Sequence, residues 1–328
     1  MKKWLSDKLG KVLCPFNNES GVAMLVALVI VVLLVAIIVE FDYGTRVAIT
    51  TAGTFRDGVQ ATYLAKSGVR AAQAILKADA RRKEAYDATT ELWATPLPPY
   101  PVGGGFVSAE ITDESGKLNV NLLQKASDSD YQTKLKPIWQ RLFKVLEIEP
   151  DVVDAIRDWV DENDLTEGVY GAEAGYYERL VPPYTCKNGP LDTISEIRLI
   201  KGITHEVYKK LTTGCGGKPC LTVAPTDKVN VNTVSVEVCQ ALDDRLNEEY
   251  CKDLVESRPI EGIDSEGDFP ASWTGLGNIR FTLKPLITIS SSYFSIQARG
   301  EVHETQRVVE AMVKRQGQNV EVLSWRLE

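Results

Sequence analysis

Histidine is scarce in this sequence, which contains only His205 and His303 among its 328 residues. A metalloprotease motif of the His-Glu-x-x-His type needs two histidines one helical turn apart, so that motif is absent. The sequence also lacks a Gly-x-Ser-x-Gly nucleophile turn, a glycine-rich phosphate loop and a Cys-x-x-Cys pair. We therefore interpret His205 as a surface residue and His303 as a strand residue, and we predict that the protein is not an enzyme.

Long apolar runs are equally scarce, because only one is present. It reads VAMLVALVIVVLLVAIIV from Val22 to Val39, and at 1.5 Å per residue it would form about 27 Å of helix, close to the thickness of a membrane's hydrocarbon core. The charged residues before it are Lys2, Lys3, Asp7, Lys8, Lys11 and Glu19. Their net charge of +2 favours a cytoplasmic N-terminus. We predict a single-pass inner-membrane protein whose chain after Glu40 lies in the periplasm.

The remainder of the chain is acidic. The whole-chain formal charge is −8, so removing the +2 of residues 1–21 leaves −10 for residues 22–328. This charge repels phosphates and argues against a nucleic-acid partner, whereas it favours a cationic one such as Ca²⁺.

A glycine, Gly21, stands on the cytoplasmic side of the apolar run. A secretory signal has its small-residue cleavage site on the far side of the run, but the residues there are EFDYGTR. A basic leader that ends in glycine before a long apolar helix is similar to a prepilin signal, so we predict cleavage by a prepilin peptidase between Gly21 and Val22. A plain signal anchor is the alternative.

The fifth residue of the mature chain would be Val26. Most pilins and pseudopilins carry a glutamate at this position, which pairs with a neighbour's amine. The absence of that glutamate fits a subunit at the end of a filament.

The later sequence predicts a small sheet interrupted by helices. Helical spacing continues over 41–84 and stops at TPLPPYPVGGG, 95–105. Alternating segments predict strands at 105–112, 293–303, 307–315 and 320–327. We expect an α+β fold: a pilin-like long N-terminal helix packed on a small antiparallel sheet, with a large all-helical insertion of the SAM or helix-hairpin-helix kind. The predicted domains are a leader (1–21), a transmembrane helix (22–40), an α/β domain (41–118 and 286–328) and two helical subdomains (119–214 and 225–285).

Each helical subdomain opens with a similar motif. GKLNVNLL at 116–123 returns as DKVNVNTV at 227–234, which places Asn121 and Asn232 as candidate helix caps. The motif resembles the start of helix-hairpin-helix modules, so a membrane-anchored periplasmic DNA receptor is an alternative function. The segments that follow are acidic and lack the glycine-flanked hairpin that binds phosphate.

Carboxylates gather in RDWVDENDLTEGVYGAEAGYY, residues 157–177. Asp158, Asp161 and Asp164 recur every third residue, so on a helix they would share a face, and Glu173 could fold back from the following loop. Converging carboxylate oxygens are the ligands that Ca²⁺ requires. The alternative is an acidic helix end with solvated carboxylates.

Five of the six cysteines follow the apolar run. In an oxidising compartment, local pairing would join Cys215 to Cys220 and Cys239 to Cys251 and leave Cys186 over. Buried free thiols are the alternative.

Taken together, the chain resembles the K-type minor pseudopilins of the type II secretion system. The resemblance is carried by the segments SGVAMLVALV, ITDESGKLNVNLL, DAIRDWVDENDL, GAEAGYYERLVPPY, PLDTISEIRLIKGIT, KVNVNTVSVEVCQAL and YFSIQARGEV. It implies a place at the pseudopilus tip with the I-type and J-type minor pseudopilins and the major pseudopilin, and a role in pseudopilus initiation and protein export. A minor pilin of a type IV pilus is an alternative.

The resemblance also implies calcium in the insertion. It assigns Asp161, Asp164 and Glu173 as ligands, with Asp158 as a weaker one. Ala174 stands where family members often carry a further acid.

Overall fold

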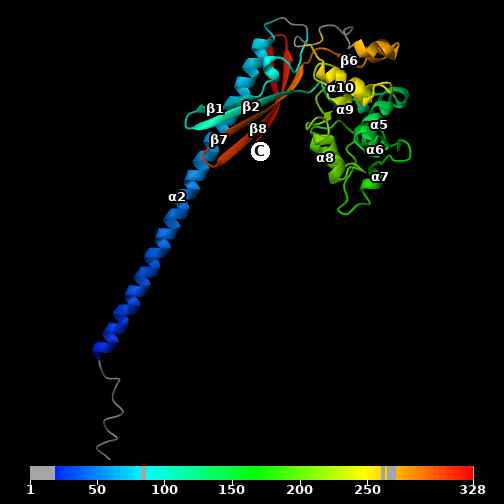
Figure 1. Ribbon diagram of the computed structural model, residues 1–328. Coiled ribbons are helices and arrows are strands. Elements are labelled where there is room, and N and C mark those ends of the chain that lie inside the picture. The colour runs from blue at the N-terminus through cyan, green and yellow to red at the C-terminus, as the bar shows by residue number, and fades with distance from the viewer. Residues whose placement is uncertain (1–18, 83–85, 260–262, 264–270, 328) are drawn as a thin grey trace, which may run out of the picture. The chain divides into compact units, whose positions relative to one another are not determined.

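A computed structural model describes residues 19–82, 86–259, 263 and 271–327 (Figure 1). The helices are α2 (Glu19–Asp79), α3 (Leu122–Lys125), α4 (Asp128–Asp130), α5 (Lys136–Val145), α6 (Val152–Val160), α7 (Ala174–Tyr177), α8 (His205–Thr213), α9 (Val236–Leu242), α10 (Glu248–Glu256) and α11 (Ile279–Leu283), with short 3-10 helices at Leu92–Ala94, Ile194–Leu199 and Ala271–Leu276 and a short π-helix at Tyr131–Leu135. The strands are β1 (Leu97–Val102), β2 (Gly105–Asp113), β3 (Leu118–Asn119), β4 (Leu221–Thr222), β5 (Val229–Asn230), β6 (Ile287–Thr288), β7 (Tyr293–Val302), β8 (Thr305–Gln316) and β9 (Asn319–Leu327).

The predicted long helix is present as α2, which runs for 61 residues. Uninterrupted helix of that length spans about 90 Å at 1.5 Å per residue. The residue contacts divide the chain into two units, Met1–Val59 and Gln60–Glu328, and α2 contributes to both. Its first part belongs to the N-terminal unit, and its last turns belong to the second unit, where they pack on a sheet.

The main sheet has the strand order β1-β2-β7-β8-β9 and is antiparallel throughout. Figure 1 shows the end of α2 lying along this sheet. Side chains of α2 that lie three or four residues apart, Ala65, Val69, Ala72 and Leu76, share a buried cluster with Phe294 and other inward residues of the strands. Gly300 on β7 permits the close approach, because a Cβ atom there would lie 2.0 Å from the carbonyl oxygen of Ala61. The predicted packing of sheet on helix is confirmed.

One strand of the main sheet was not predicted, and neither were the two-residue strands β3, β4, β5 and β6, which pair within or beside the insertion that we expected to be all-helical. The segment 95–105, which we read only as a helix breaker, contains β1, and β1 pairs with β2 at the edge of the sheet. Its prolines, Pro98, Pro99 and Pro101, lack the N–H that a central strand must donate, so an edge is the position where such a segment fits.

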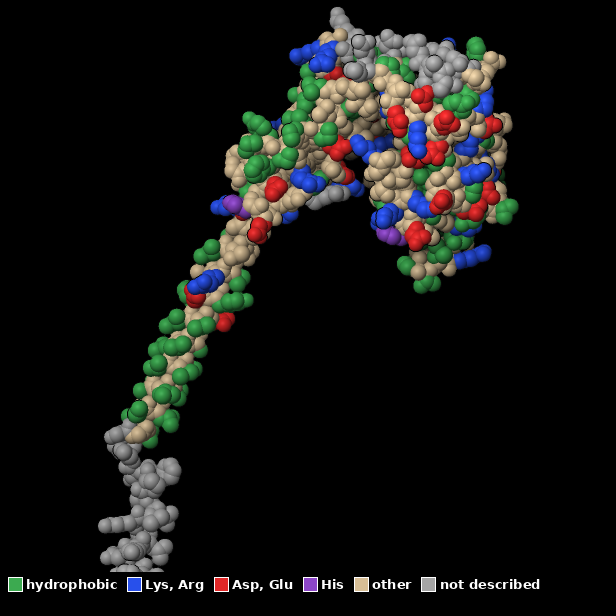
Figure 2. Space-filling view, viewed as in Figure 1, with side chains coloured by type: hydrophobic (Ala, Val, Ile, Leu, Met, Phe, Trp, Pro, Cys, Tyr) green, Lys and Arg blue, Asp and Glu red, His purple; other side chains and the backbone are tan. Residues whose placement is uncertain are grey.

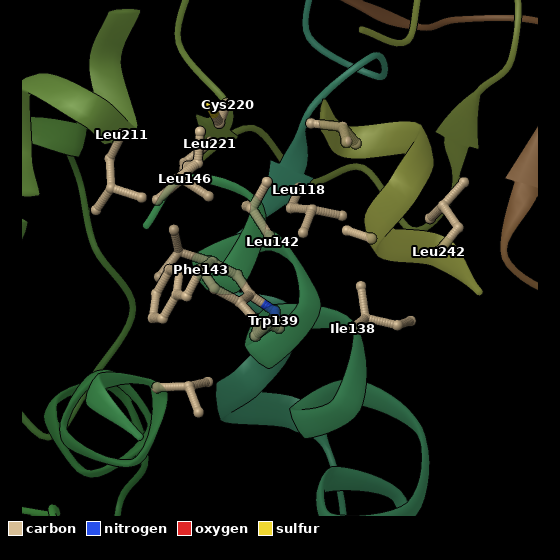
Figure 3. Close-up of a cluster of buried hydrophobic side chains, with 14 of the residues drawn as sticks. Leu118, Ile138, Trp139, Leu142, Phe143, Leu146, Leu211, Cys220, Leu221 and Leu242 are labelled. Carbon is tan, nitrogen blue, oxygen red and sulfur yellow. The ribbon is translucent and has the colours of Figure 1, made fainter. Parts of the chain in front are cut away.

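The helical insertion is built around one hydrophobic cluster. Its buried side chains extend from Leu118 to Ile287 and so include both predicted subdomains. Figure 3 shows Trp139, Leu142 and Phe143 of α5 among Leu118, Leu211 and Leu221 from other segments. The boundaries of the two subdomains remain a prediction.

The repeated Asn motif is visible as two equivalent structural units. β3 pairs with β4 and β5 pairs with β6, both in parallel. The side chain of Asn121 donates to the carbonyl oxygen of Leu191 (3.0 Å) and accepts from the Leu191 N–H (2.7 Å). Asn232 does the same with Ile263, at 2.9 and 2.8 Å.

The predicted cap position is confirmed for Asn121, which is the N-cap residue of α3, but it is wrong for Asn232. Asn121 makes no side-chain capping bond to α3, and α9 is capped by Ser235, which accepts from the Val238 N–H. Each asparagine side chain instead makes two hydrogen bonds to the backbone of one distant residue, as a paired strand residue would.

Candidate metal centre and membrane helix

The acidic segment lies at the end of α6, an amphipathic helix whose nine residues are all buried. The helix stops at Val160, and Asp161 already has an extended backbone. Asp158 is therefore the only predicted ligand on this helix, and the expectation that three aspartates share one helical face is wrong. A loop carries Asp161 and Asp164, and Glu173 precedes α7.

Asp158 is completely buried. Its Oδ1 accepts a hydrogen bond from the Glu167 N–H (2.9 Å), whereas Oδ2 has no hydrogen-bond partner among the described residues. Burial raises the pKa of Asp158 to about 7; the N–H groups of Glu167 and Ala172 lower it, and the charges of Asp161 and Glu167 raise it. Such an oxygen is available to a cation.

Gly171 makes room beside this carboxylate. A Cβ atom at position 171 would lie 2.3 Å from Oδ2 of Asp158. A side chain there would displace the carboxylate or the loop that carries Glu173, so a glycine is needed for this close approach.

Glu173 is the second buried carboxylate. Neither of its oxygens has a hydrogen-bond partner among the described residues. Burial, together with the negative charges of Asp158, Asp161 and Asp164, raises the pKa of Glu173 to about 8. The four predicted ligands therefore lie close enough for the charges of the three aspartates to act on Glu173.

The other two predicted ligands have partners within the protein. Asp161 is buried, and its Oδ2 lies 3.3 Å from Nε of Arg157. Asp164 is exposed, and its Oδ1 accepts a hydrogen bond from the side chain of Asn188 (2.9 Å). These contacts leave Asp158 and Glu173 as the carboxylates with the greatest need of a counter-charge.

This donor set fits a hard cation. Ca²⁺ binds carboxylate and carbonyl oxygens in flexible arrangements, and buried carboxylates without partners are costly unless a cation or a proton compensates them. The fit rests on the three oxygens without hydrogen bonds on Asp158 and Glu173.

A second group of carboxylates lies outside the insertion and was not predicted. Among the described residues, Asp79, Asp87 and Glu91 offer oxygens that all lie within 4.8 Å of one another, a spacing that the four predicted ligands do not meet. Arg315 neutralises part of this group by pairing with Asp79 at 2.8 Å and with Asp87. The pairing of Arg315 with Asp79 bridges 236 positions, so no local sequence pattern could have indicated it.

The cysteines after the apolar run form two disulfides, Cys215–Cys220 and Cys239–Cys251, and leave Cys186 free. The two histidines lie apart: His205 is exposed at the start of α8, and His303 is at a positive φ in the turn between β7 and β8, not in a strand as predicted.

The apolar run lies within α2. Among the described residues, this is the one helix long and apolar enough to cross a membrane. Every side chain from 21 to 52 is exposed, and Figure 2 shows hydrophobic groups around this part of the helix. Gly21 and Val22 lie close to its start, while the predicted leader up to residue 18 is outside the described residues.

Comparison with known proteins identifies similar sequences over nearly the whole chain. The family model for "Type II secretion system (T2SS), protein K" matches residues 116–225. The chain is 27% identical over 314 residues to a type II secretion system protein K from Pseudomonas aeruginosa, covering 91% of this chain and 90% of that protein. It is 27% identical over 332 residues to the protein of the same name from Aeromonas hydrophila, covering 95% and 97%.

A similar fold occurs in a crystal structure of the GspK-GspI-GspJ complex from the type 2 secretion system of enterotoxigenic Escherichia coli. The match has a TM-score of 0.69 at 19% sequence identity and covers 87% of this chain and 99% of that chain.

Proposed function

Because the chain belongs to the protein K family of the type II secretion system, we propose that it is a minor pseudopilin at the tip of the pseudopilus, where it assists initiation of the filament and export of proteins across the outer membrane. The relatives favour this function over both alternatives, a periplasmic DNA receptor and a minor pilin of a type IV pilus.

One observation carries the proposal. The helix α2 is exposed from 21 to 52 and packs on its own sheet only near its C-terminal end. An apolar helix surface of this size needs a membrane or other apolar helices around it. A subunit that first sits in the membrane and then joins a bundle of similar helices meets both needs.

Val26 supports a position at the tip. A carboxylate inside an apolar bundle is costly unless a neighbour's charge pairs with it. With valine at this position, the mature chain has no such group to offer to the amine of a subunit above it. The chain therefore suits the first subunit of a filament, which has no subunit above it.

In this proposal the chain after Glu40, which we call the head, lies in the periplasm, and the N-terminus lies in the cytoplasm. The lysine-rich leader supports that orientation. The two disulfides fit the oxidising periplasm. The protein acts by assembly with the I-type, J-type and major pseudopilins, as the relative in the GspK-GspI-GspJ complex does with GspI and GspJ, and not by catalysis.

Calcium is part of the proposal. Asp158 and Glu173 would hold the ion, with Asp161 and Asp164 as further oxygen donors. The bound cation would supply the positive charge that the buried carboxylates lack, and so hold the loop after α6 against the start of α7. Its role is structural.

Labelling of overproduced pseudopili tests the tip position. An epitope in the exposed β1–β2 turn at Gly103 and Gly104 of this subunit should be detected by immunogold at one end of each filament, while an epitope on the major pseudopilin should label the shaft. Gold particles along the shaft for this subunit would reject the tip assignment.

A further inference from the structure

The two edges of the main sheet differ in their chemistry. At one edge, β1 contains three prolines in six residues, which removes backbone donors. At the other edge, β9 is nine residues long, contains no proline and has a strand neighbour, β8, on one side only within the described chain. The backbone N–H and C=O groups on its outer side have no strand partner within the described chain, and one of them, the Val320 carbonyl, accepts a hydrogen bond from the Gln73 side chain (3.3 Å). Such an edge is a template for another strand.

The face of β9 toward α2 is apolar and uncovered. Val322, Trp325 and Leu327 pair with Val313, Ala311 and Val309, which are buried in the cluster that contains α2 side chains. All three nevertheless remain exposed, by 36, 57 and 53% respectively. The ammonium group of Lys66 on α2 lies 4.8 Å from the centre of the Trp325 ring, which places this apolar strip at the flank of the helix.

A bulge in β9 leaves Leu323 without a partner in β8 and 47% exposed, and the residues paired on the opposite face, Ser324 and Arg326, are polar. Ser324 and Arg326 line a cavity of about 940 Å³ whose lining also includes Glu110, Lys218 and Glu310. Arg326 donates to Glu310 at 2.7 Å, and Lys218, in the loop closed by the Cys215–Cys220 disulfide, donates to Glu110 at 2.7 Å. A strand added beside β9 would therefore need apolar side chains on the face toward α2 and polar ones on the face toward the cavity.

We propose that β9 pairs edge to edge with a strand of a second pilin-like subunit, so that the sheet continues from one subunit into the next. The inference rests on the proposed function, because it names the surface by which this chain meets its neighbour. A pilin-like subunit has the required alternation at its own sheet edge, since one face of its sheet is buried under its own long helix and the other is hydrated. Backbone hydrogen bonds along β9 would give affinity, and Trp325 would anchor the apolar side.

A second copy of this chain does not meet the same requirements. Two identical edges related by a two-fold axis pair antiparallel, so the helix segments 60–79 packed on the joined sheet would also run antiparallel. Their N-terminal ends would then point in opposite directions, which is incompatible with anchoring both chains in one membrane. A different subunit, joined without two-fold symmetry, avoids this conflict.

Photo-crosslinking in membranes tests the proposal on the full-length chain. Benzoylphenylalanine is placed at position 322 or 327 on β9, or at Tyr100 on β1 as the control, since Tyr100 is 68% exposed at the proline-containing edge. The chain is co-expressed with the I-type, J-type and major pseudopilins of the same system, and adducts are identified by mass spectrometry. We expect adducts with one of these subunits from 322 and 327 and none from 100.

Substitution of Trp325 gives a second readout. Trp325→Glu should lower the amount of co-purified subunits at least about tenfold, as loss of a buried aromatic anchor does, whereas Tyr100→Glu should not change it. Unchanged melting temperatures for both variants show that the head still folds, and Leu327→Arg replaces Trp325→Glu if that variant does not fold.

The outcomes separate this inference from the proposed function. Adducts from 322 and 327 only with a second copy of this chain overturn the inference. A yield of adducts from 322 and 327 that is zero, or no greater than the yield from position 100 on β1, also overturns it. If the wild-type chain still co-purifies with the other subunits in that case, the proposed function stands. Failure of the wild-type chain to co-purify with any of them overturns both.

Discussion

The guanidinium group of Arg315 on β8 donates a hydrogen bond of 2.8 Å from Nη1 to Oδ2 of Asp79 at the C-terminal end of α2. Its Nη2 donates to Asp87 and to the carbonyl oxygen of Ser291. Asp79 and Asp87 have buried side chains, and Glu91 lies beside them. Arg315 thus joins the end of the long helix to the sheet, in a place where carboxylates outnumber the cation that pairs with them.

Arg315→Met should destabilise the head strongly. The substitution keeps a long side chain but leaves Asp79 and Asp87 buried without their cation, which costs about 3 kcal/mol or more of unfolding free energy. Thermal melting of the detergent-solubilised full-length chain measures it. The matched control is Arg326→Met, because Arg326 pairs with Glu310 at an exposed site and exposed pairs contribute about 0 to 1 kcal/mol. Equal losses in the two variants would contradict the role given to Arg315.

Glu91 makes this cluster sensitive to pH. Its pKa is raised from 4.5 to about 7, mainly by burial and also by the charges of Asp79 and Asp87, which together outweigh the hydrogen bonds from the N–H groups of Ala88 and Trp93. The folded protein therefore holds a proton that the unfolded chain releases at lower pH, so stability falls as the pH rises from about 4.5 to about 7.

Glu91→Gln should remove this loss, because glutamine keeps an acceptor for the Ala88 and Trp93 N–H groups. We expect the variant to match the wild type near pH 5 and to exceed it by about 1 to 3 kcal/mol at pH 8. Melting at both pH values checks this. Glu321→Gln, exposed on β9, is the control and should not change the pH dependence. A wild-type advantage at pH 8 would disprove the assignment.

The strands and the long helix could be predicted because their signals are local. Alternation along 293–303 and 307–315 reflects side chains that face either α2 or solvent. β1 was missed because its prolines indicate a break, and only its pairing partner β2 makes it a strand. Asn121 was assigned to its own helix, whereas its partner, Leu191, lies 70 residues away.

The candidate metal centre shows the same limit. Its carboxylates were recognisable from their density in the sequence. Which of them lack partners depends on contacts with Arg157 and Asn188, and the place where the helix stops depends on packing. Sequence therefore indicated the chemistry of the site but not the distribution of charge within it.

Glu173→Gln should separate calcium binding from folding. In excess Ca²⁺ the variant should melt below the wild type, since an ion present at about a hundred times its Kd stabilises a protein by about 2.7 kcal/mol. In chelator it should melt at the same temperature or higher, because glutamine removes a buried carboxyl that has no partner and that folding must protonate. Asp192→Asn, at an exposed carboxylate paired with Lys187, is the control and should respond to calcium as the wild type does. Equal losses with calcium and with chelator would argue against ligation.

The two disulfides should contribute unequally to stability. The Cys239–Cys251 bridge closes 12 residues and the Cys215–Cys220 bridge closes 5, so chain entropy predicts losses of about 3 and about 2 kcal/mol when they are removed. Alanine is the appropriate replacement because all four cysteines are buried and serine would add an unpaired hydroxyl. Melting of the two double variants under oxidising conditions measures the difference. A larger loss from the shorter loop would show that entropy of the unfolded chain is not the main term.

Processing at Gly21 gives a test that is independent of folding. In cells with an active prepilin peptidase, the membrane form should have the mass of a chain that begins at Val22, and Gly21→Leu should retain the leader because it replaces the glycine after which we predict cleavage. Among the described residues, no atom lies within 4 Å of a Cβ atom built at position 21. Gly44→Leu is the matched control, because Gly44 lies in the same helix with equally open surroundings, and this variant should be cut normally. Recovery of the wild-type chain with Met1 still attached would reject the cleavage site and leave a plain signal anchor as the better description of this segment.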